Sequence, residues 1–172
     1  MTLAQESRLP GAEQNPCCMG TEAAELLTVL EGYIADELAE RRLYLIRSLM
    51  KERAEYRDLR VPEDAQNQRR LLRSLMNVRA PGAADEAFLS VQDAYLRQEL
   101  ADEGITSLDD LKPVSGDLYL WQGDITRLKC GAIVNAANSG MTGCYIPCHA
   151  CIDNCIHTYA GIQLRQDCAA LM

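Results

Sequence analysis

The stretch LYLWQGDITRLKCGAIVNAAN, residues 118–138, decides how the second half of this 172-residue chain is expected to fold. It contains two short β-prone runs, 118–122 and 131–135, and the second is continuously apolar, as in a strand buried on both faces. Between them, Asp124 is well placed to cap one or two turns of helix. This alternation predicts a compact βαβ-like unit and places the chain in the α/β class.

Directly downstream, the segment GCYIPCHAC at 143–151 brings three cysteines and one histidine close together. Zinc is bound by thiolates and imidazoles, and a catalytic zinc site has three protein ligands and one open position. Cys144, His149 and Cys151 fit that arrangement, on a loop that Pro147 keeps out of regular helix. The sequence therefore predicts a zinc site with an open fourth position.

Other interpretations of these cysteines stay open. Four of them recur at helical intervals and could form an all-thiolate cluster: Cys144, Cys148, Cys151 and Cys155. Pro147 disfavours a helix through all four, because it lacks a backbone donor and biases Ile146 away from the α region. The thiols could also be small buried hydrophobic side chains, or could serve redox chemistry.

Polar residues follow both predicted strands. Asp124 comes after the first strand and Asn138 after the second, so both are expected at the sheet edge where open α/β sheets bind ligands. A carboxylate can accept a hydrogen bond from an exocyclic amine, and an amide can bind sugar hydroxyls. Each residue also has a plain structural interpretation, Asp124 as a helix cap and Asn138 as a turn residue.

The chain before this region is expected to be helical. Residues 1–20 are interpreted as a flexible leader, residues 21–113 as a helical N-terminal module and residues 114–172 as the α/β portion. Apolar spacing predicts four helices, over 21–56, 62–76, 85–102 and 152–172. Ser107 and Asp110 have the spacing of a capping box, and His157 is interpreted as a packed helical side chain rather than a ligand.

Composition limits the function classes. The net charge of −8 would repel a phosphate backbone, which argues against nucleic-acid binding. The sequence has no apolar run long enough for a membrane span and no signal-peptide pattern, so we expect a cytoplasmic protein. Of the eight cysteines, all but Cys17 and Cys18 fall between Cys130 and Cys168. Such a local cluster favours metal or thiolate chemistry over disulfides in a reducing compartment.

Several motifs appear in order: GDIT, VNAAN, the Cys-x4-His-x-Cys loop and IDNxIHxxAG. Together they closely resemble the opening of a macrodomain, the ADP-ribose-binding α/β fold, and in particular its zinc-containing bacterial branch of protein-ADP-ribose hydrolases. The stretch from about Leu43 to Pro113 resembles the N-terminal extension of that branch. The resemblance covers roughly three quarters of the chain.

The resemblance implies a role for each matching residue. Asp124 would hold the adenine amine, and the backbone of Ile125 would help to seat the adenine. Asn138 would contact the distal ribose at the reaction centre, and Asp153 would handle protons there. Zinc would be bound by the three predicted ligands, leaving Cys148 a bystander. The implied partner is ADP-ribose or an ADP-ribosylated protein.

The resemblance also implies a three-layer α/β/α macrodomain, of which two strands are only the beginning. We therefore expect this chain to be an amino-terminal part, truncated within the fold and inactive alone. Two alternatives remain open. One is a macrodomain that binds ADP-ribose without cleaving it. The other is a helical interaction protein in which zinc has a structural role only.

Overall fold

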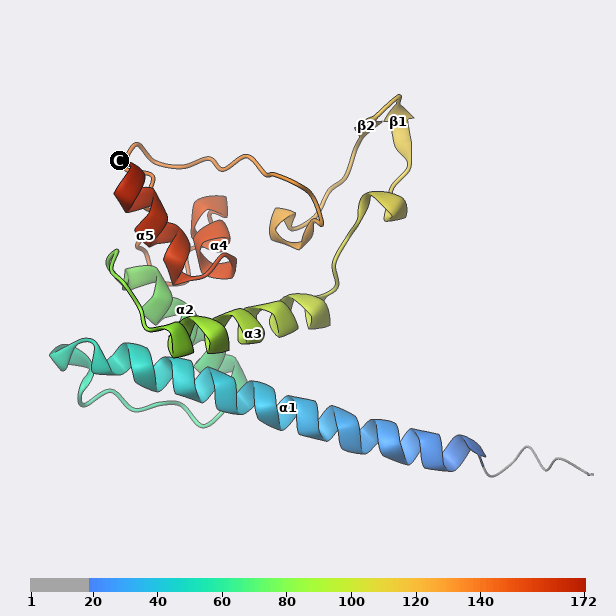
Figure 1. The fold of residues 1–172 in the computed structure, drawn as a ribbon, viewed down its shortest axis with the longest axis horizontal. Helices are drawn as coiled ribbons and strands as arrows, with labels where there is room; N and C mark the ends of the chain where they lie inside the picture. Colours follow the sequence, from blue (N-terminus) through green and yellow to red (C-terminus); the bar gives the residue numbers. More distant parts are fainter. Residues whose placement is uncertain (1–18) are drawn as a thin grey trace, which may run out of the picture. The chain divides into compact units, whose positions relative to one another are not determined.

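The computed structural model describes residues 19–172, which form helices and one small two-stranded sheet (Figure 1). The chain divides into two units, one ending at Asp36 and the other running from Glu37 to Met172. Residues 1–18, which make up most of the predicted leader, lie outside the described residues. Met19 and Gly20 already belong to the first helix.

The first unit contains the start of α1, the helix Met19–Lys51. Its apolar residues recur every three or four positions, which is why the sequence predicts a helix there. Their side chains are exposed in this part of α1, including Leu26, Leu30 and Ile34. None of the helices described between residues 19 and 172 combines the length and apolarity that a bilayer span needs.

The second unit has its core where the end of α1 packs with α2, Ala65–Val78, and α3, Glu86–Glu103. Asp64 and Asp85 cap the two helices by accepting hydrogen bonds from backbone N–H groups in the first turn. The core is formed by apolar side chains from all three helices and one from α5: Leu38, Leu45, Ile46, Leu49, Leu72, Leu75, Met76, Phe88, Tyr95, Leu96 and Ile162. The helices predicted at 62–76 and 85–102 are confirmed, with small shifts at their ends.

The helix predicted over 21–56 ends earlier than expected. It stops at Lys51, and a separate 3-10 turn, η1, covers Ala54–Tyr56. Farther along, the capping box of Ser107 and Asp110 is confirmed at the 3-10 turn η2, Leu108–Asp110. The capping box could be predicted because it depends on neighbouring residues only.

The sheet consists of β1, Pro113–Ser115, and β2, Leu118–Tyr119, which pair antiparallel. The predicted strand at 118–122 is therefore shorter than expected. The run at 131–135 is not a strand, and the predicted βαβ-like unit is wrong for this structure. A strand buried on both faces needs paired neighbours at its edges. The described chain supplies none to residues 131–135, and Val134 is 88% exposed.

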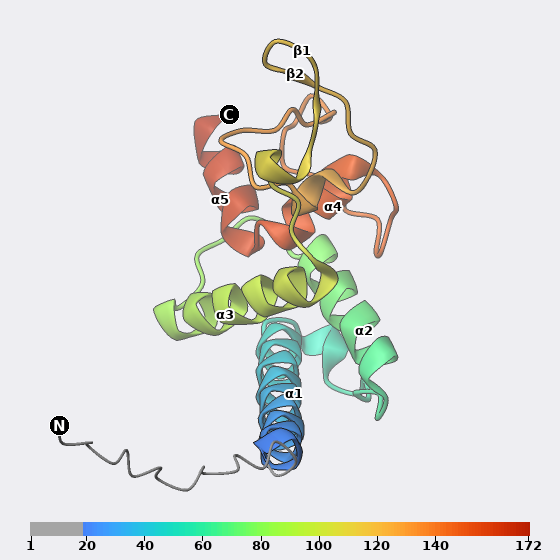
Figure 2. The ribbon, with the colours of Figure 1, turned by 90° about the vertical axis from the view of Figure 1, so that its right-hand side faces the viewer.

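The last helix is also different from the prediction. Instead of one helix over 152–172, α4 covers Ile152–Tyr159 and α5 covers Ile162–Leu171. Gly161 separates them with a φ of +84°, a left-handed conformation that side chains disfavour. A Cβ atom at this position would also lie 2.4 Å from the amide nitrogen of Gln92 on α3. Figure 2 shows α4 and α5 together, with α4 beside α2.

Candidate metal site and its surroundings

The three predicted zinc ligands come together in the loop before α4. The thiol sulfurs of Cys144 and Cys151 and a ring nitrogen of His149 all lie within 4.8 Å of one another. The sulfur of Cys144 is 3.7 Å from Nδ1 of His149. Tetrahedral zinc with ordinary bond lengths places such donors roughly 3.3–3.8 Å apart. Small side-chain movements would therefore bring all three within bonding distance of one ion.

The beginning of α4 fixes one side of the loop. Cys151 is the N-cap residue of α4, and its sulfur accepts a hydrogen bond from the backbone N–H of Asn154. The amide side chain of Asn154, which is fully buried, donates to the carbonyl oxygens of Ile146 at 3.0 Å and Cys144 at 3.4 Å. Asn154 thus ties together the two ends of the segment that carries the ligands.

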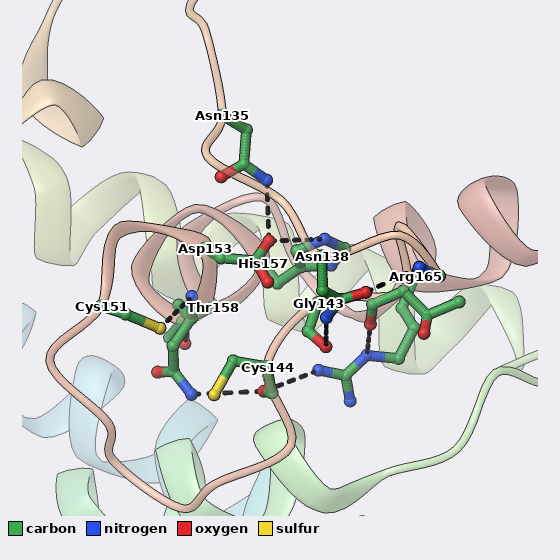
Figure 3. Close-up of polar contacts among 12 residues, drawn as sticks. Asn135, Asn138, Gly143, Cys144, Cys151, Asp153, His157, Thr158 and Arg165 are labelled. Carbon is green, nitrogen blue, oxygen red and sulfur yellow. Dashed lines mark hydrogen bonds and ion pairs between the residues drawn. The ribbon is translucent and has the colours of Figure 1, made fainter.

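Arg165 on α5 fixes the other side of the loop (Figure 3). Its buried guanidinium donates to the carbonyl oxygens of Thr142, at 2.7 Å, and Cys144, at 3.4 Å. It also donates to carbonyls at the end of α2, including Asn77 at 2.7 Å, and lies over the ring of Tyr145. One cation therefore joins the loop to two helices.

Cys148 faces away from this cluster. Its sulfur lies 3.2 Å from the hydroxyl of Ser74 and contacts the carbonyl oxygen of Arg70, both on α2. The segment 143–151 contains no helix, so a helical all-cysteine cluster does not form. The cysteines described are all free of disulfides.

A second polar cluster lies on α4, close to Gly143 at the start of the loop. The buried carboxylate of Asp153 accepts a hydrogen bond of 2.8 Å from the amide of Asn135, and it lies 3.7 Å from Nε2 of His157. His157 is packed, as predicted, and its ring is so close to Gly143 that a Cβ atom there would lie 2.7 Å away. Burial lowers the pKa of His157, although the carboxylate of Asp153 opposes this effect.

The other predicted site residues have mainly local contacts. Asn138 accepts from the N–H of Gly140 and donates to the carbonyl of Gly143 at 3.2 Å, so it lies beside the first residue of the segment 143–151, the metal loop. Asp124 caps the 3-10 turn η3, Ile125–Arg127, through bonds from Thr126 to a single carboxylate oxygen. The expected common edge for Asp124 and Asn138 is not formed, because the second strand is absent.

Sequence reasoning missed three residues that shape the loop: Arg73 and Asn77 on α2, and Arg165 on α5. Arg73 and Asn77 are separated by one helical turn, which places both on one face of α2. This spacing of two polar residues could have predicted a polar face on a helix whose other face lies in the core. Nothing in the sequence, however, indicated which segment this face would contact.

No family model matches the chain. A protein-ADP-ribose hydrolase of Treponema medium is 58% identical over 137 residues, which are 77% of this chain and 52% of the relative. A protein-ADP-ribose hydrolase of Staphylococcus aureus strain Mu50 is 47% identical over 130 residues, covering 75% of this chain and 48% of the relative. The chain spans about half the length of these curated relatives.

A more distant similarity links the chain to a probable bifunctional ADP-ribose hydrolase/ADP-ribosyltransferase of Fusarium oxysporum f. sp. cubense. It is 41% identical over 109 residues, or 57% of this chain and 18% of the relative. The chain is thus similar over most of its length to proteins named as ADP-ribose hydrolases.

Proposed function

We propose that the protein removes ADP-ribose from modified proteins and that this chain supplies a zinc site formed by Cys144, His149 and Cys151. The observation that carries the proposal is the approach of these three donors to within 4.8 Å of one another. The similarity to proteins named protein-ADP-ribose hydrolases supports the removal of ADP-ribose as the reaction. The proposal extends to the zinc-containing macrodomain branch that the motifs resemble.

The donor set fits zinc rather than a harder cation. Two thiolates and one imidazole are typical zinc ligands, whereas magnesium and calcium prefer oxygen. Three protein ligands leave one position open, the arrangement of catalytic rather than structural zinc sites. Bound there, zinc would supply Lewis-acid polarisation of a sugar oxygen or a water molecule.

The residues of the chain would bind and orient the substrate around this site. Asn138 is exposed and hydrogen-bonded to Gly143, next to the first zinc ligand, which suits contact with the distal ribose. Asp153 lies in the first turn of α4, two residues after the ligand Cys151, with Asn135 fixing one carboxylate oxygen, which suits a group that handles protons. Asn138 and Asp153 are thus the proposed catalytic residues.

At the adenine end, we propose Asp124 and the backbone of Ile125. Both capping bonds of Asp124 fall on the same oxygen, Oδ1, and the side chain is exposed. The second oxygen can therefore accept from an exocyclic amine without loss of the cap. The backbone of Ile125 begins the 3-10 turn η3 directly beside that carboxylate.

The first test is the metal content of the purified chain. We expect about one zinc per chain by elemental analysis, as a single site requires. Replacing both sulfur ligands, Cys144→Ser with Cys151→Ser, should abolish stoichiometric zinc. Cys168→Ser, on α5 and outside the cluster, is the matched control and should retain it. A chain without stoichiometric zinc would overturn the proposal.

The second test measures release of ADP-ribose from a modified protein by the whole protein that carries this sequence. We expect release that stops with a chelator and in the double serine variant, and that returns when zinc is added back to the wild type. Binding of ADP-ribose without release would identify a non-catalytic binding protein instead. Zinc content without any affinity for ADP-ribose would identify a structural zinc loop.

A further inference from the structure

Two side chains on α2 hold the backbone of the metal loop at two adjacent residues. Asn77 accepts a hydrogen bond of 2.9 Å from the N–H of Cys148, and Arg73 donates one of 2.8 Å to the carbonyl oxygen of His149. The two residues are one helical turn apart, so they grip the Cys148–His149 dipeptide from one face of α2. Neither residue is a metal ligand.

The dipeptide needs such support. Cys148 has a φ of +52°, a left-handed conformation that is uncommon for residues with a Cβ atom, because the Cβ comes too close to the carbonyl oxygen. A conformation of this kind persists only where its surroundings hold it. The N–H of Cys148 itself is held by Asn77, and its sulfur by Ser74. The direction in which the chain leaves Cys148 determines where the imidazole of His149 points.

Asn77 is a rigid support because it is fixed at both ends of its amide. It is only 1% exposed, and its nitrogen donates to the hydroxyl of Thr158 on α4 at 2.9 Å. That hydroxyl donates in turn to the carbonyl oxygen of Asn154 at 2.8 Å. Asn77 therefore couples the loop to the helix that begins at the ligand Cys151.

Arg73 links the same parts by a second route. The nitrogen that donates to His149 also donates to the side-chain oxygen of Asn154 at 2.8 Å. Asn154 holds the carbonyl groups of Ile146 and Cys144 with its amide nitrogen. One guanidinium nitrogen thus relates the backbone of His149 to that of Cys144, the two ligands that lie 3.7 Å apart.

We propose that Arg73 and Asn77 are positioning residues that hold His149 in the geometry the metal requires. The inference rests on the proposed metal site. Replacing residues that orient the ligands of a metal site typically lowers the metal affinity by about 10- to 100-fold. The helical region before the α/β portion would then be part of the metal centre rather than an appendage to it.

The test is a titration of the purified chain with cobalt(II), in which the thiolate charge-transfer and visible absorption bands report binding. We expect Asn77→Ala and Arg73→Met each to weaken cobalt binding by about 10-fold or more. The double variant should lose less binding free energy than the two single variants lose together, because both residues hold one dipeptide. Arg73→Lys should recover part of the affinity, since one ammonium donor can reach a single carbonyl.

The charge of Arg73 makes the direction of the effect informative. Removing a nearby cation should by itself strengthen the binding of a metal cation, because a repulsion is lost. Weaker binding in Arg73→Met therefore cannot come from the lost repulsion itself. Arg73→Lys, which keeps the positive charge, and Gln92→Ala, which tests stability, separate lost positioning from lost charge and from lost stability. Unchanged or tighter binding would overturn the inference for this residue.

Gln92→Ala is the matched control for a general loss of stability. Gln92 is also fully buried, and it joins α3 to α5 through bonds to Ile162 and Gln163 without contacting the loop. We expect it to lower stability but leave cobalt affinity within about two-fold of the wild type. Equal losses of affinity in Gln92→Ala and Asn77→Ala would show that both residues act only through folding.

The result separates this inference from the proposed function. If the wild-type chain binds neither cobalt nor zinc, the metal site itself is wrong. If the wild type binds cobalt and the variants bind it equally well, only the positioning role is wrong. Should Asn77→Ala fail to fold, the Arg73→Met and Arg73→Lys pair still decides the question, because Arg73 is only partly buried.

Discussion

The metal loop with α4 and the stretch 118–138 carry equally clear sequence motifs, yet their structures are very different. The loop is held by polar side chains from three helices, α2, α4 and α5, and Asn154 at its base is fully buried. The stretch 118–138 contains the two residues of β2, one 3-10 turn and a single bridge residue, Leu128, as regular structure, and Val134 is 88% exposed.

The difference lies in what each region needs from the rest of the protein. The loop needs ligands close together in sequence and a few buried side chains, and the described chain supplies both. A buried strand needs partners on each edge and layers on each face. Residues 131–135 have neither in this structure, so the edge that would bring Asp124 and Asn138 together is not built.

Among the polar contacts of the loop, the largest stability effect is expected at Arg165. Arg165→Met preserves most of the volume but removes the donors to the carbonyl oxygens of Asn77, Arg79 and Thr142. Buried acceptors left without partners cost about 1–3 kcal/mol each, so we expect a loss of at least ~3 kcal/mol in urea denaturation. Arg97→Met, at a side chain 79% exposed, should cost no more than about 0.5 kcal/mol. Similar losses at both sites would mean that the loop is not held as described.

A smaller effect is expected at Gly143. It has a φ of +82°, and an added Cβ would meet the ring of His157 at 2.7 Å. Gly143→Ala should therefore reduce the free energy of unfolding by about 2 kcal/mol. Gly131→Ala is the control in the other region, where an added Cβ meets no heavy atom within 4 Å. It should be neutral or slightly stabilising in the same measurement. A larger loss at Gly131 would reverse the contrast between the two regions.

The buried histidine should give the loop region a pH dependence. Burial lowers the pKa of His157 below its usual 6.5, so the unfolded chain binds the proton first as the pH falls. The contribution of neutral His157 to the free energy of unfolding is therefore complete above pH 6.5. It decreases as the pH falls toward the lowered pKa of His157 in the folded chain, and it changes no further below that pKa. The free energy of unfolding, measured by urea denaturation with chelator present, should change more steeply with pH in the wild type than in His157→Gln between pH 6.5 and the lowered pKa of His157. Parallel curves would exclude this role for His157.

The smallest effect is expected at Val134. Val134→Asp changes a side chain that is 88% exposed, so the stability of the chain should stay within about 0.5 kcal/mol. Ile156→Asp, at a buried position on α4, should by contrast cost several kcal/mol or prevent folding. A strong loss at Val134 would indicate that residues 131–135 pack as a buried strand after all.

The candidate site was predicted from sequence to different degrees. The grouping of Cys144, His149 and Cys151 could be predicted because they lie within eight residues and Pro147 disfavours a helix, so local chain geometry brings them near one another. Packing of His157 was also predicted correctly. The roles of Arg73, Asn77 and Arg165 could not be predicted, because each contact joins residues that are far apart in the sequence.

The sequence by itself determined where most helical residues lie, the capping roles of Asp124 and of Ser107 with Asp110, and the donor set of the metal loop, because periodicity, capping and ligand spacing are local properties. Only the tertiary structure decided that the last helix breaks at Gly161, where Gln92 comes from α3, and that residues 131–135 remain outside any sheet. It also decided which helix face supports His149. These outcomes depend on partners brought in from distant parts of the chain, which no local pattern can specify.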